Sequence, residues 1–190
     1  MPRDPRCLVD PRTGEALRAC EKPEYYPSFS TMSQRDSSDA ATRDVVIARA
    51  ESVSTIRFFS PRELATAEAV FDRLLPQDDR VEGFKIPIVP LVDERLYARR
   101  GAGYRFEGTP DDSEVMRIAL RAIDAMASEL YGMPFHALPI ALQETLVHSL
   151  REGEPLGARG HWKGLPVAHA WTLLVQDAVE AYSAHPWAWD

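Results

Sequence analysis

The sequence predicts an all-α protein of about five to six helices with an extended N-terminal arm. No segment shows sustained alternation of apolar and polar residues between hairpin turns, which argues against β-strands. Several segments instead repeat apolar residues at spacings of three and four after a recognisable helix start. The predicted organisation is an arm over residues 1–35 and a single all-α domain over residues 36–190.

The arm is rich in proline, which interrupts any helical period within it. Tyr25, Tyr26 and Phe29 give it an apolar weight that a purely solvated tail would lack. We therefore expect the arm to lie on a surface, either of its own chain or of a partner.

Both cysteines of the chain, Cys7 and Cys20, stand in this arm. Three alternatives remain open for them: free thiols in a reducing compartment, a disulfide with each other, or a bond to a partner chain. A disulfide between the two would restrict the unfolded arm, whereas free thiols are the usual state in the cytoplasm.

The first helix is predicted over about residues 39–51, with Ser37 or Ser38 as its cap. The clearest helix start of the chain is Ser60, because Pro61 follows at the first helical position and Glu63 is placed to close a capping box. An apolar stripe follows this start, and Pro76 ends the helix.

A further helix is predicted from Pro87 to about Arg100, where Gly101 ends it. The segment Thr109-Pro110-Asp111-Asp112 repeats the pattern of a capping residue followed by proline, and it opens the longest helix of the chain. Gly132 terminates this helix.

Leucines at a strict four-residue spacing predict the next helix, which ends at Gly153: Leu138, Leu142, Leu146 and Leu150. Phe135 leads into it. The last helix is predicted from about Pro166 to Ser183, and Pro186 prevents its continuation.

The charge balance excludes several classes of partner. The chain carries 22 basic and 29 acidic residues, a formal net charge of −7, which opposes binding to nucleic acid or to anionic lipid. Its longest apolar stretch, residues 86–92, contains two prolines and is far shorter than the ~20 residues of a membrane-spanning helix. Residues 1–6 show neither an apolar export segment nor a twin-arginine element, which favours the cytoplasm, export with a partner, or a signal already removed.

No residue pattern points to chemistry within this chain. Neither the helix beginning at Ser60 nor the later helices show an interior polar constellation, and the histidines are scattered. The cysteines have no histidine nearby that could complete a zinc site. We therefore expect no catalytic, cofactor-binding or metal-binding residues here.

The C-terminal segment carries large aromatic side chains that no following element of this sequence can cover. Tyr182, His185, Trp187 and Trp189 stand close together in it. Exposed indole rings are costly in water, and aromatic anchors are typical of interface cores. These four residues, with Tyr25, Tyr26 and Phe29 of the arm, are the candidate partner interface.

An ordered series of short motifs over about residues 55–190 resembles the gluconate 2-dehydrogenase subunit 3 family, the small subunits of flavin-dependent sugar and polyol dehydrogenase complexes. The matching pieces are Phe58-Phe59-Ser60-Pro61-x-Glu63, Phe71-Asp72-Arg73-Leu74-Leu75-Pro76-Gln77-Asp78, Phe135-x-x-Leu138 with Gln143, and Tyr182-Ser183-x-His185-Pro186.

The resemblance implies a non-catalytic accessory subunit that supports the folding or export of a catalytic subunit of the glucose-methanol-choline type. That partner would carry FAD, and a cytochrome or another electron-transfer subunit would accept its electrons. Many relatives are exported, which implies a periplasmic location, with the cytoplasm as the alternative. Some relatives are joined to their catalytic subunit by a disulfide, a position that neither Cys7 nor Cys20 matches. The alternative function is a free-standing helical domain that binds a ligand or acts as an adaptor.

Overall fold

The computed structural model describes residues 31–80, 85–101, 108 and 110–189. Every regular element in these ranges is a helix, so the all-α prediction is confirmed. Most of the predicted arm lies outside the described residues, and with it Cys7, Cys20, Tyr25, Tyr26 and Phe29.

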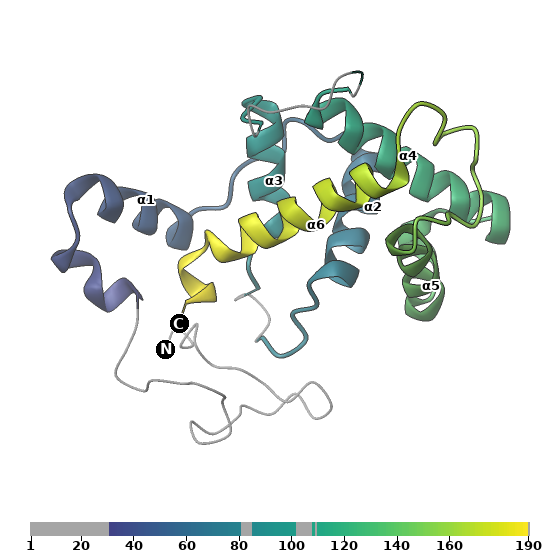
Figure 1. Cartoon of the computed structure of the whole chain (residues 1–190). Coiled ribbons are helices and arrows are strands. Elements are labelled where there is room, and N and C mark those ends of the chain that lie inside the picture. The colour runs from purple at the N-terminus through teal and green to yellow at the C-terminus, as the bar shows by residue number, and fades with distance from the viewer. Residues whose placement is uncertain (1–30, 81–84, 102–107, 109, 190) are drawn as a thin grey trace. The chain divides into compact units, whose positions relative to one another are not determined.

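Helices account for the regular structure of the described chain (Figure 1). The α-helices are α1 (Ala40–Glu51), α2 (Pro61–Leu74), α3 (Ile88–Tyr97), α4 (Asp112–Tyr131), α5 (Ile140–Arg151) and α6 (Val167–Ser183). Three 3-10 helices accompany them: η2 (Thr31–Ser37), η3 (Phe135–Ala137) and η4 (Pro186–Ala188).

The chain divides into two compact units. The described residues of the first unit fall between 31 and 53, between 77 and 87 and between 180 and 190. The second unit takes in residues 54–76 and the described part of 88–179.

The capping box predicted at Ser60 is present and begins α2. The Ser60 Oγ accepts a hydrogen bond from the Glu63 backbone N–H at 3.4 Å, and the Glu63 carboxylate accepts one from the Ser60 N–H at 3.1 Å. Two of the otherwise unpaired donors at the helix start are thereby satisfied.

Two other helix starts differ from the prediction. Asp39, not Ser37 or Ser38, caps α1 by accepting a hydrogen bond from the Thr42 N–H at 3.1 Å, because Ser37 still belongs to η2. Asp111 caps α4 in the same way, with the Glu114 N–H at 2.9 Å. An ionised carboxylate is the stronger acceptor and also complements the helix dipole.

Three helix boundaries also differ from the predicted ones. Helix α3 ends at Tyr97 rather than near Arg100, because Arg99 adopts a φ of 52° that no helix can continue. Helix α5 begins only at Ile140, after Pro139 at its cap position, so Leu138 lies before the helix as a buried residue. It ends at Arg151, two residues before the predicted Gly153.

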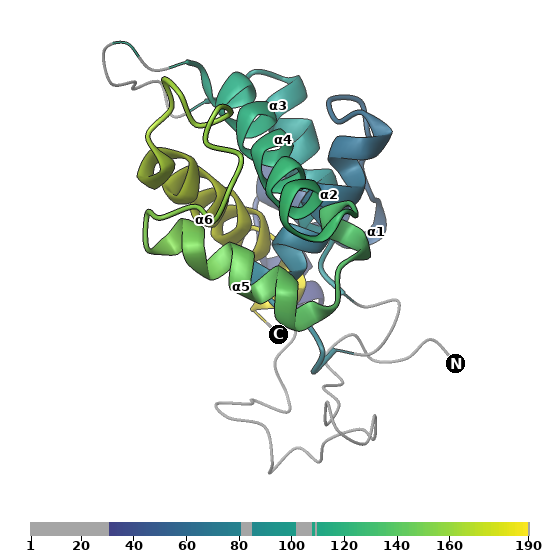
Figure 2. The ribbon, with the colours of Figure 1, turned by 90° about the vertical axis from the view of Figure 1, so that its right-hand side faces the viewer.

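The second unit is organised around α2, which contacts α3, α4, α5 and η3 (Figure 2). Apolar side chains from all of these elements are buried, among them Phe71, Val92, Met116, Ile123 and Phe135. Phe135, on the short helix η3, is completely buried and packs in the region where η3 meets α2 and α4. This core fixes the relative positions of the polar groups described below.

Candidate functional site

Two of the four C-terminal candidate residues contact one arginine in the first unit, and a third, His185, packs against one of these two. The Arg80 Nη2 donates hydrogen bonds to the Tyr182 Oη at 3.0 Å and to the Trp187 carbonyl at 3.1 Å. The buried His185 accepts a hydrogen bond at Nδ1 from the Trp187 backbone N–H, and the two rings lie 4.7 Å apart, edge to face. We call Tyr182, His185, Trp187 and Trp189 the C-terminal aromatic cluster.

The two indoles of this cluster differ in exposure. Trp187 is half-buried, whereas 65% of Trp189 is exposed although its Nε1 donates a hydrogen bond to the Ser183 carbonyl at 2.7 Å. The hydrogen bond holds the Trp189 ring in place while leaving its apolar face open to solvent. The structure thus presents a fixed, exposed indole, which is costly in isolation and useful at an interface.

A groove of about 430 Å³ runs beside this exposed indole within the first unit. Its walls come from η2, α1 and the C-terminal segment, and its lining is mainly apolar: Thr31, Ala41, Thr42, Val45, Val46, Arg49, Ala184, Pro186 and Trp189. Arg49 ties two walls together by donating to the Ala184 carbonyl at 2.7 Å. No residue of α1 is buried, and its apolar side chains Ala41, Val45 and Val46 line the groove.

The prediction that the helices hold no interior polar constellation is wrong. Among the described residues of the second unit, four carboxylates are buried: Glu63, Asp93, Asp124 and Asp177. Each of them accepts hydrogen bonds from backbone N–H groups, from arginines or from both. A buried carboxylate needs such partners because its desolvation is otherwise very costly.

Asp93 on α3 fixes the chain that enters α2. Its two oxygens accept hydrogen bonds from three consecutive backbone N–H groups, those of Arg57 at 2.8 Å and of Phe58 and Phe59 at 2.9 Å each. These groups stand just before the Ser60 cap, and no solvent reaches Asp93. Asp93 therefore serves as the structural anchor of the segment that precedes α2.

Glu63 and Asp124 form a second network with three arginines between α2 and α4. The Glu63 carboxylate binds Arg117 at 2.8 Å and Arg121 at 3.1 Å. Asp124 accepts from Arg62 at Nε and Nη2, at 2.7 and 2.6 Å, and from the Phe135 N–H at 2.9 Å.

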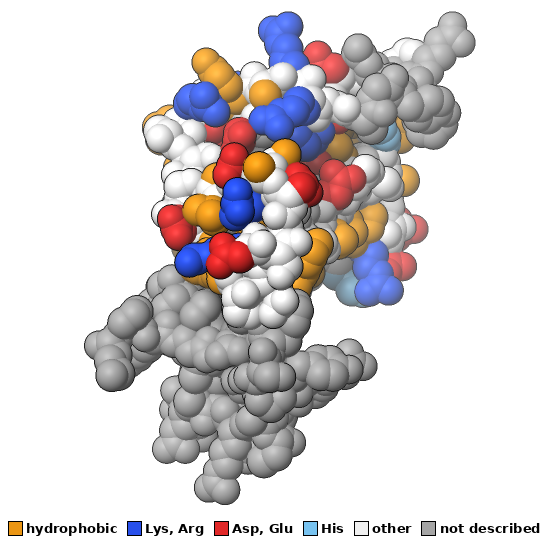
Figure 3. Space-filling view, turned by 90° about the vertical axis from the view of Figure 1, so that its left-hand side faces the viewer, with side chains coloured by type: hydrophobic (Ala, Val, Ile, Leu, Met, Phe, Trp, Pro, Cys, Tyr) orange, Lys and Arg blue, Asp and Glu red, His pale blue; other side chains and the backbone are white. Residues whose placement is uncertain are grey.

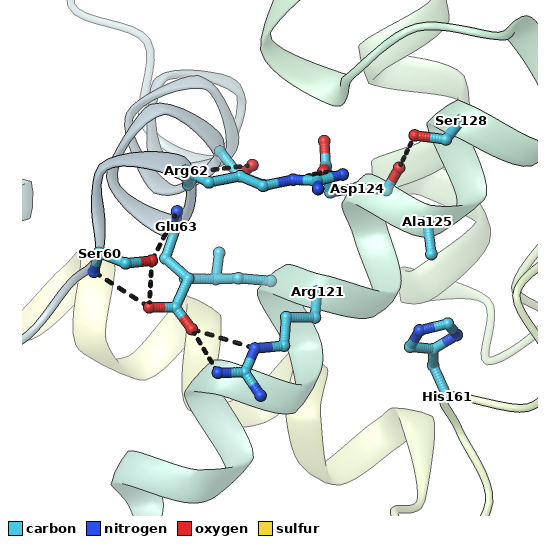
Figure 4. A pocket seen from close by; sticks show the side chains of 10 residues that line it. Ser60, Arg62, Glu63, Arg121, Asp124, Ala125, Ser128 and His161 are labelled. Atoms are coloured by element: carbon cyan, nitrogen blue, oxygen red, sulfur yellow. Dashed lines mark hydrogen bonds and ion pairs between the residues drawn. The ribbon is translucent and has the colours of Figure 1, made fainter.

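Figure 4 shows the side chains around a pocket of about 480 Å³, which we call the α2–α4 pocket. Arg62 with Asp124 lies at one side of the view, Glu63 with Arg121 lies at another, and His161 faces them from the loop before α6. The lining residues are Ser60, Arg62, Glu63, Thr66, Leu120, Arg121, Asp124, Ala125, Ser128 and His161.

The surroundings of Glu63 stabilise its ionised form. Burial opposes ionisation, but the hydrogen bonds from Ser60 and the charges of Arg117 and Arg121 outweigh it and hold the pKa of Glu63 below its ordinary value of 4.5. Because this pKa is lower in the folded than in the unfolded chain, the stabilisation is present above pH 4.5 and is lost as the pH falls through the folded pKa.

We expect the replacement Glu63→Gln to flatten the acid side of the stability profile. The free energy of unfolding of the wild-type chain should fall as the pH drops below the ordinary pKa of Glu63, 4.5, and the contribution of Glu63 to that fall should be missing in the variant. Denaturant titrations at several pH values measure both slopes. Glu68→Gln, at an exposed position of the same helix, is the control and should keep the wild-type slope. Parallel profiles of Glu63→Gln and wild type would contradict the assignment.

A third buried pair joins α3 to α6 and to the start of α4. Arg95 donates to Asp177 at 2.7 Å and to Asp112 at 3.0 Å. Burial alone would lower the pKa of Arg95, but the two carboxylates reverse that effect and raise it. Arg95 therefore stays charged and holds three helices of the second unit together.

The described ranges contain neither a candidate metal site nor a helix that could span a membrane. No group of three or more His, Cys, Asp or Glu side chains there has the arrangement of a metal site. None of the described helices combines the length and the apolar character needed to cross a membrane. On the face seen in Figure 3, acidic, basic and hydrophobic side chains are interspersed, without a basic stripe of the kind that binds nucleic acid.

The profile of one protein family, described as Gluconate 2-dehydrogenase subunit 3, matches residues 61–190. The chain belongs to this family. The match confirms the resemblance inferred from the sequence motifs, and it takes in α2 and every later element, including the α2–α4 pocket and the C-terminal aromatic cluster. Comparisons with curated proteins and with solved structures give no match.

The motifs that carried the resemblance have structural roles in this subunit 3 protein. The Gln143 side-chain amide donates to the carbonyls of Phe135 and Leu138 at 3.1 Å each, which explains why these three residues occur together. Ser60 and Glu63 form the capping box, and His185 with Pro186 opens η4.

Sequence reasoning missed Arg80 and the arginines of the α2–α4 pocket. Arg80 stands in a segment predicted only as a turn, and its partners Tyr182 and Trp187 are 102 and 107 positions away. No local sequence pattern predicts a contact between residues so far apart in the chain. For the second unit, acidic residues within apolar helix faces were a signal in the sequence that these side chains are buried with partners.

Proposed function

We propose that this chain is the non-catalytic small subunit of a flavin-dependent dehydrogenase complex that oxidises a sugar, a polyol or a glycoside. The observation that carries the proposal is the family match over residues 61–190, whose description names a third subunit of a dehydrogenase. A subunit of that kind acts together with other chains. In this proposal FAD is held by a catalytic partner of the glucose-methanol-choline type, and a cytochrome or another electron carrier accepts the electrons.

The partners of the buried carboxylates support an accessory role. Asp93 is used to hold three backbone N–H groups, Asp124 to hold Arg62 and the start of η3, and Asp177 to hold Arg95. These side chains position the helices of the subunit itself. The chemistry of the proposed complex then belongs to the partner.

The first unit supplies the surface on which we place the partner. The exposed face of Trp189 and the adjoining apolar groove offer a hydrophobic contact, and we propose that Tyr25, Tyr26 and Phe29 of the arm add to it. Obligate interfaces bury on the order of 2,000 Å² or more and have apolar cores. Covering the catalytic subunit in this way would stabilise its folded form by mass action. We propose that the folded pair is then exported to the periplasm.

Co-expression tests the proposed function. The full chain is produced alone and together with a flavoprotein of the glucose-methanol-choline type from the same genome, and the purified material is examined for bound flavin and sugar-dependent dye reduction. A yellow, active complex containing both chains is expected, together with a colourless and inactive isolated chain. Turnover by the isolated chain would overturn the proposal. If the chain instead purifies as a monomer that does not bind the flavoprotein, the proposal fails and a free-standing binding domain is favoured.

The replacement Trp189→Ser should weaken the complex without unfolding the subunit. A central aromatic anchor contributes about 2 kcal/mol or more to binding, whereas truncating an indole that is 65% exposed changes folding stability little. Affinity is measured by titrating the labelled subunit with the flavoprotein. Val53→Ser is the matched control, because Val53 is 66% exposed in the same unit and lies outside the groove. Equal affinity of both variants would remove Trp189 from the interface.

A further inference from the structure

We propose that the α2–α4 pocket receives an acidic side chain, Asp or Glu, of the partner subunit. The inference rests on the proposed function, because it requires a partner protein. It concerns a site in the second unit, whereas the C-terminal aromatic cluster belongs to the first. The pocket would add a specific electrostatic contact to the apolar one.

Two arginines line the pocket, and a buried carboxylate fixes the orientation of each. Arg62 uses Nε and Nη2 to bind Asp124, and Arg121 uses Nε and Nη2 to bind Glu63. The two carboxylates are 4% and 5% exposed, whereas the arginine side chains are 75% and 60% exposed. Each guanidinium therefore rests on a buried anion and presents its remaining donors to the outside.

The charges of the network favour an anion. Arg62 and Arg121 balance Glu63 and Asp124 in the pocket lining. Arg117 lies outside the lining but also binds Glu63, so the network as a whole carries three positive charges against two negative charges. One positive charge is therefore left over in the network. This local excess stands out in a chain whose formal net charge is −7.

The hydroxyl groups of the pocket already donate their hydrogens to acceptors of this chain, which leaves the arginines as the donors for an incoming anion. Ser60 donates its hydroxyl hydrogen to Glu63, Thr66 donates to the Arg62 carbonyl, and Ser128 donates to the Asp124 carbonyl. The Nη1 groups of Arg62 and Arg121 take part in no hydrogen bond with the described residues. A planar carboxylate is the natural acceptor for guanidinium donors of this kind.

The size and access of the pocket fit a side chain inserted from another protein. It encloses about 480 Å³, and Leu120 and Ala125 give it apolar walls that can cover the methylene groups of Asp or Glu. Because the arginines are already held by buried anions, little conformational freedom is lost when the carboxylate binds.

The test introduces a carboxylate into the pocket by a substitution in this chain. Ala125 lines it, is half-buried, and stands four residues after Arg121 on α4, so the carboxylate introduced by Ala125→Glu can pair with that arginine. Ala125→Gln adds a side chain of the same shape without the charge. Neither variant removes a partner of Glu63 or Asp124.

The affinity of each full-length variant for the flavoprotein subunit is then measured by titration at low and at moderate salt. Ala125→Glu should bind about tenfold or more weaker than Ala125→Gln, because the introduced charge occupies the arginines and repels the incoming carboxylate. The loss of affinity of the wild-type chain on adding salt should also exceed that of Ala125→Glu.

Equal affinities of Ala125→Glu and Ala125→Gln would overturn the inference while leaving the proposed function intact, since a complex would still form. If the wild-type chain forms no complex with the flavoprotein, the proposed function fails and the inference falls with it. Stronger binding by Ala125→Glu would also overturn it, because the pocket would then favour a cationic partner.

Discussion

Replacing Asp93 by Asn is expected to destabilise the chain by about 3 to 5 kcal/mol. Asp93 is fully buried and accepts hydrogen bonds from three consecutive backbone N–H groups, those of Arg57, Phe58 and Phe59. An asparagine keeps the size of the side chain but offers one oxygen, and its NH₂ group would face a backbone donor. The loss is a large part of the stability of about 5 to 15 kcal/mol that is typical of a protein.

Chemical denaturation of the two full chains, followed by circular dichroism, measures this difference. Asp79→Asn makes the same chemical change at an exposed position and should alter the free energy of unfolding by less than about 0.5 kcal/mol. An Asp93→Asn variant as stable as Asp79→Asn would show that Asp93 does not hold the segment before α2.

The helices could be predicted because their start signals are local. The capping box at Ser60 involves residues only three positions apart, and the structure contains it as predicted. The caps of α1 and α4 were assigned to the wrong residue for a related reason. Ser37, Ser38 and Asp39 all have side chains that can cap a helix, and a local pattern does not decide which of them begins it.

The buried carboxylates were readable in part from helical periodicity. Asp93 lies four residues after Val89, and Asp124 four residues after Leu120, so both stand within buried apolar faces. An acidic residue in such a position needs a partner. The identity of that partner could not be predicted, because Arg62 and Asp124 are 62 positions apart and meet only through the packing of α2 on α4.

The C-terminal aromatic cluster shows a similar division. The sequence indicates that Trp187 and Trp189 stand close to Tyr182 and His185, and Trp189 is largely exposed in the structure. It does not indicate that Arg80 organises the cluster, nor that His185 is buried. These features depend on how the described parts of the first unit fold together, which a linear pattern does not contain.

The replacement Phe135→Ala is expected to cost about 3 to 5 kcal/mol, an effect similar to that of Asp93→Asn. Phe135 is completely buried where η3 packs on α2 and α4. Its backbone is clamped on both sides, because Asp124 accepts from its N–H and Gln143 donates to its carbonyl. The clamped backbone limits the collapse of the surroundings into the vacated space, so a cavity should remain.

Denaturant titrations of Phe135→Ala and Phe135→Leu separate the cavity from the clamp. The leucine variant fills most of the volume and should lose less than half as much stability, because both variants keep the hydrogen bonds to Asp124 and Gln143. Met133→Ala, at a position 42% exposed just before η3, is the control and should change stability little. If Phe135→Ala and Met133→Ala were equally stable, the ring would not be part of the core. Because η3 contacts both α2 and α4, removing the Phe135 ring should also weaken the packing between these two helices, which carry Glu63 and Asp124.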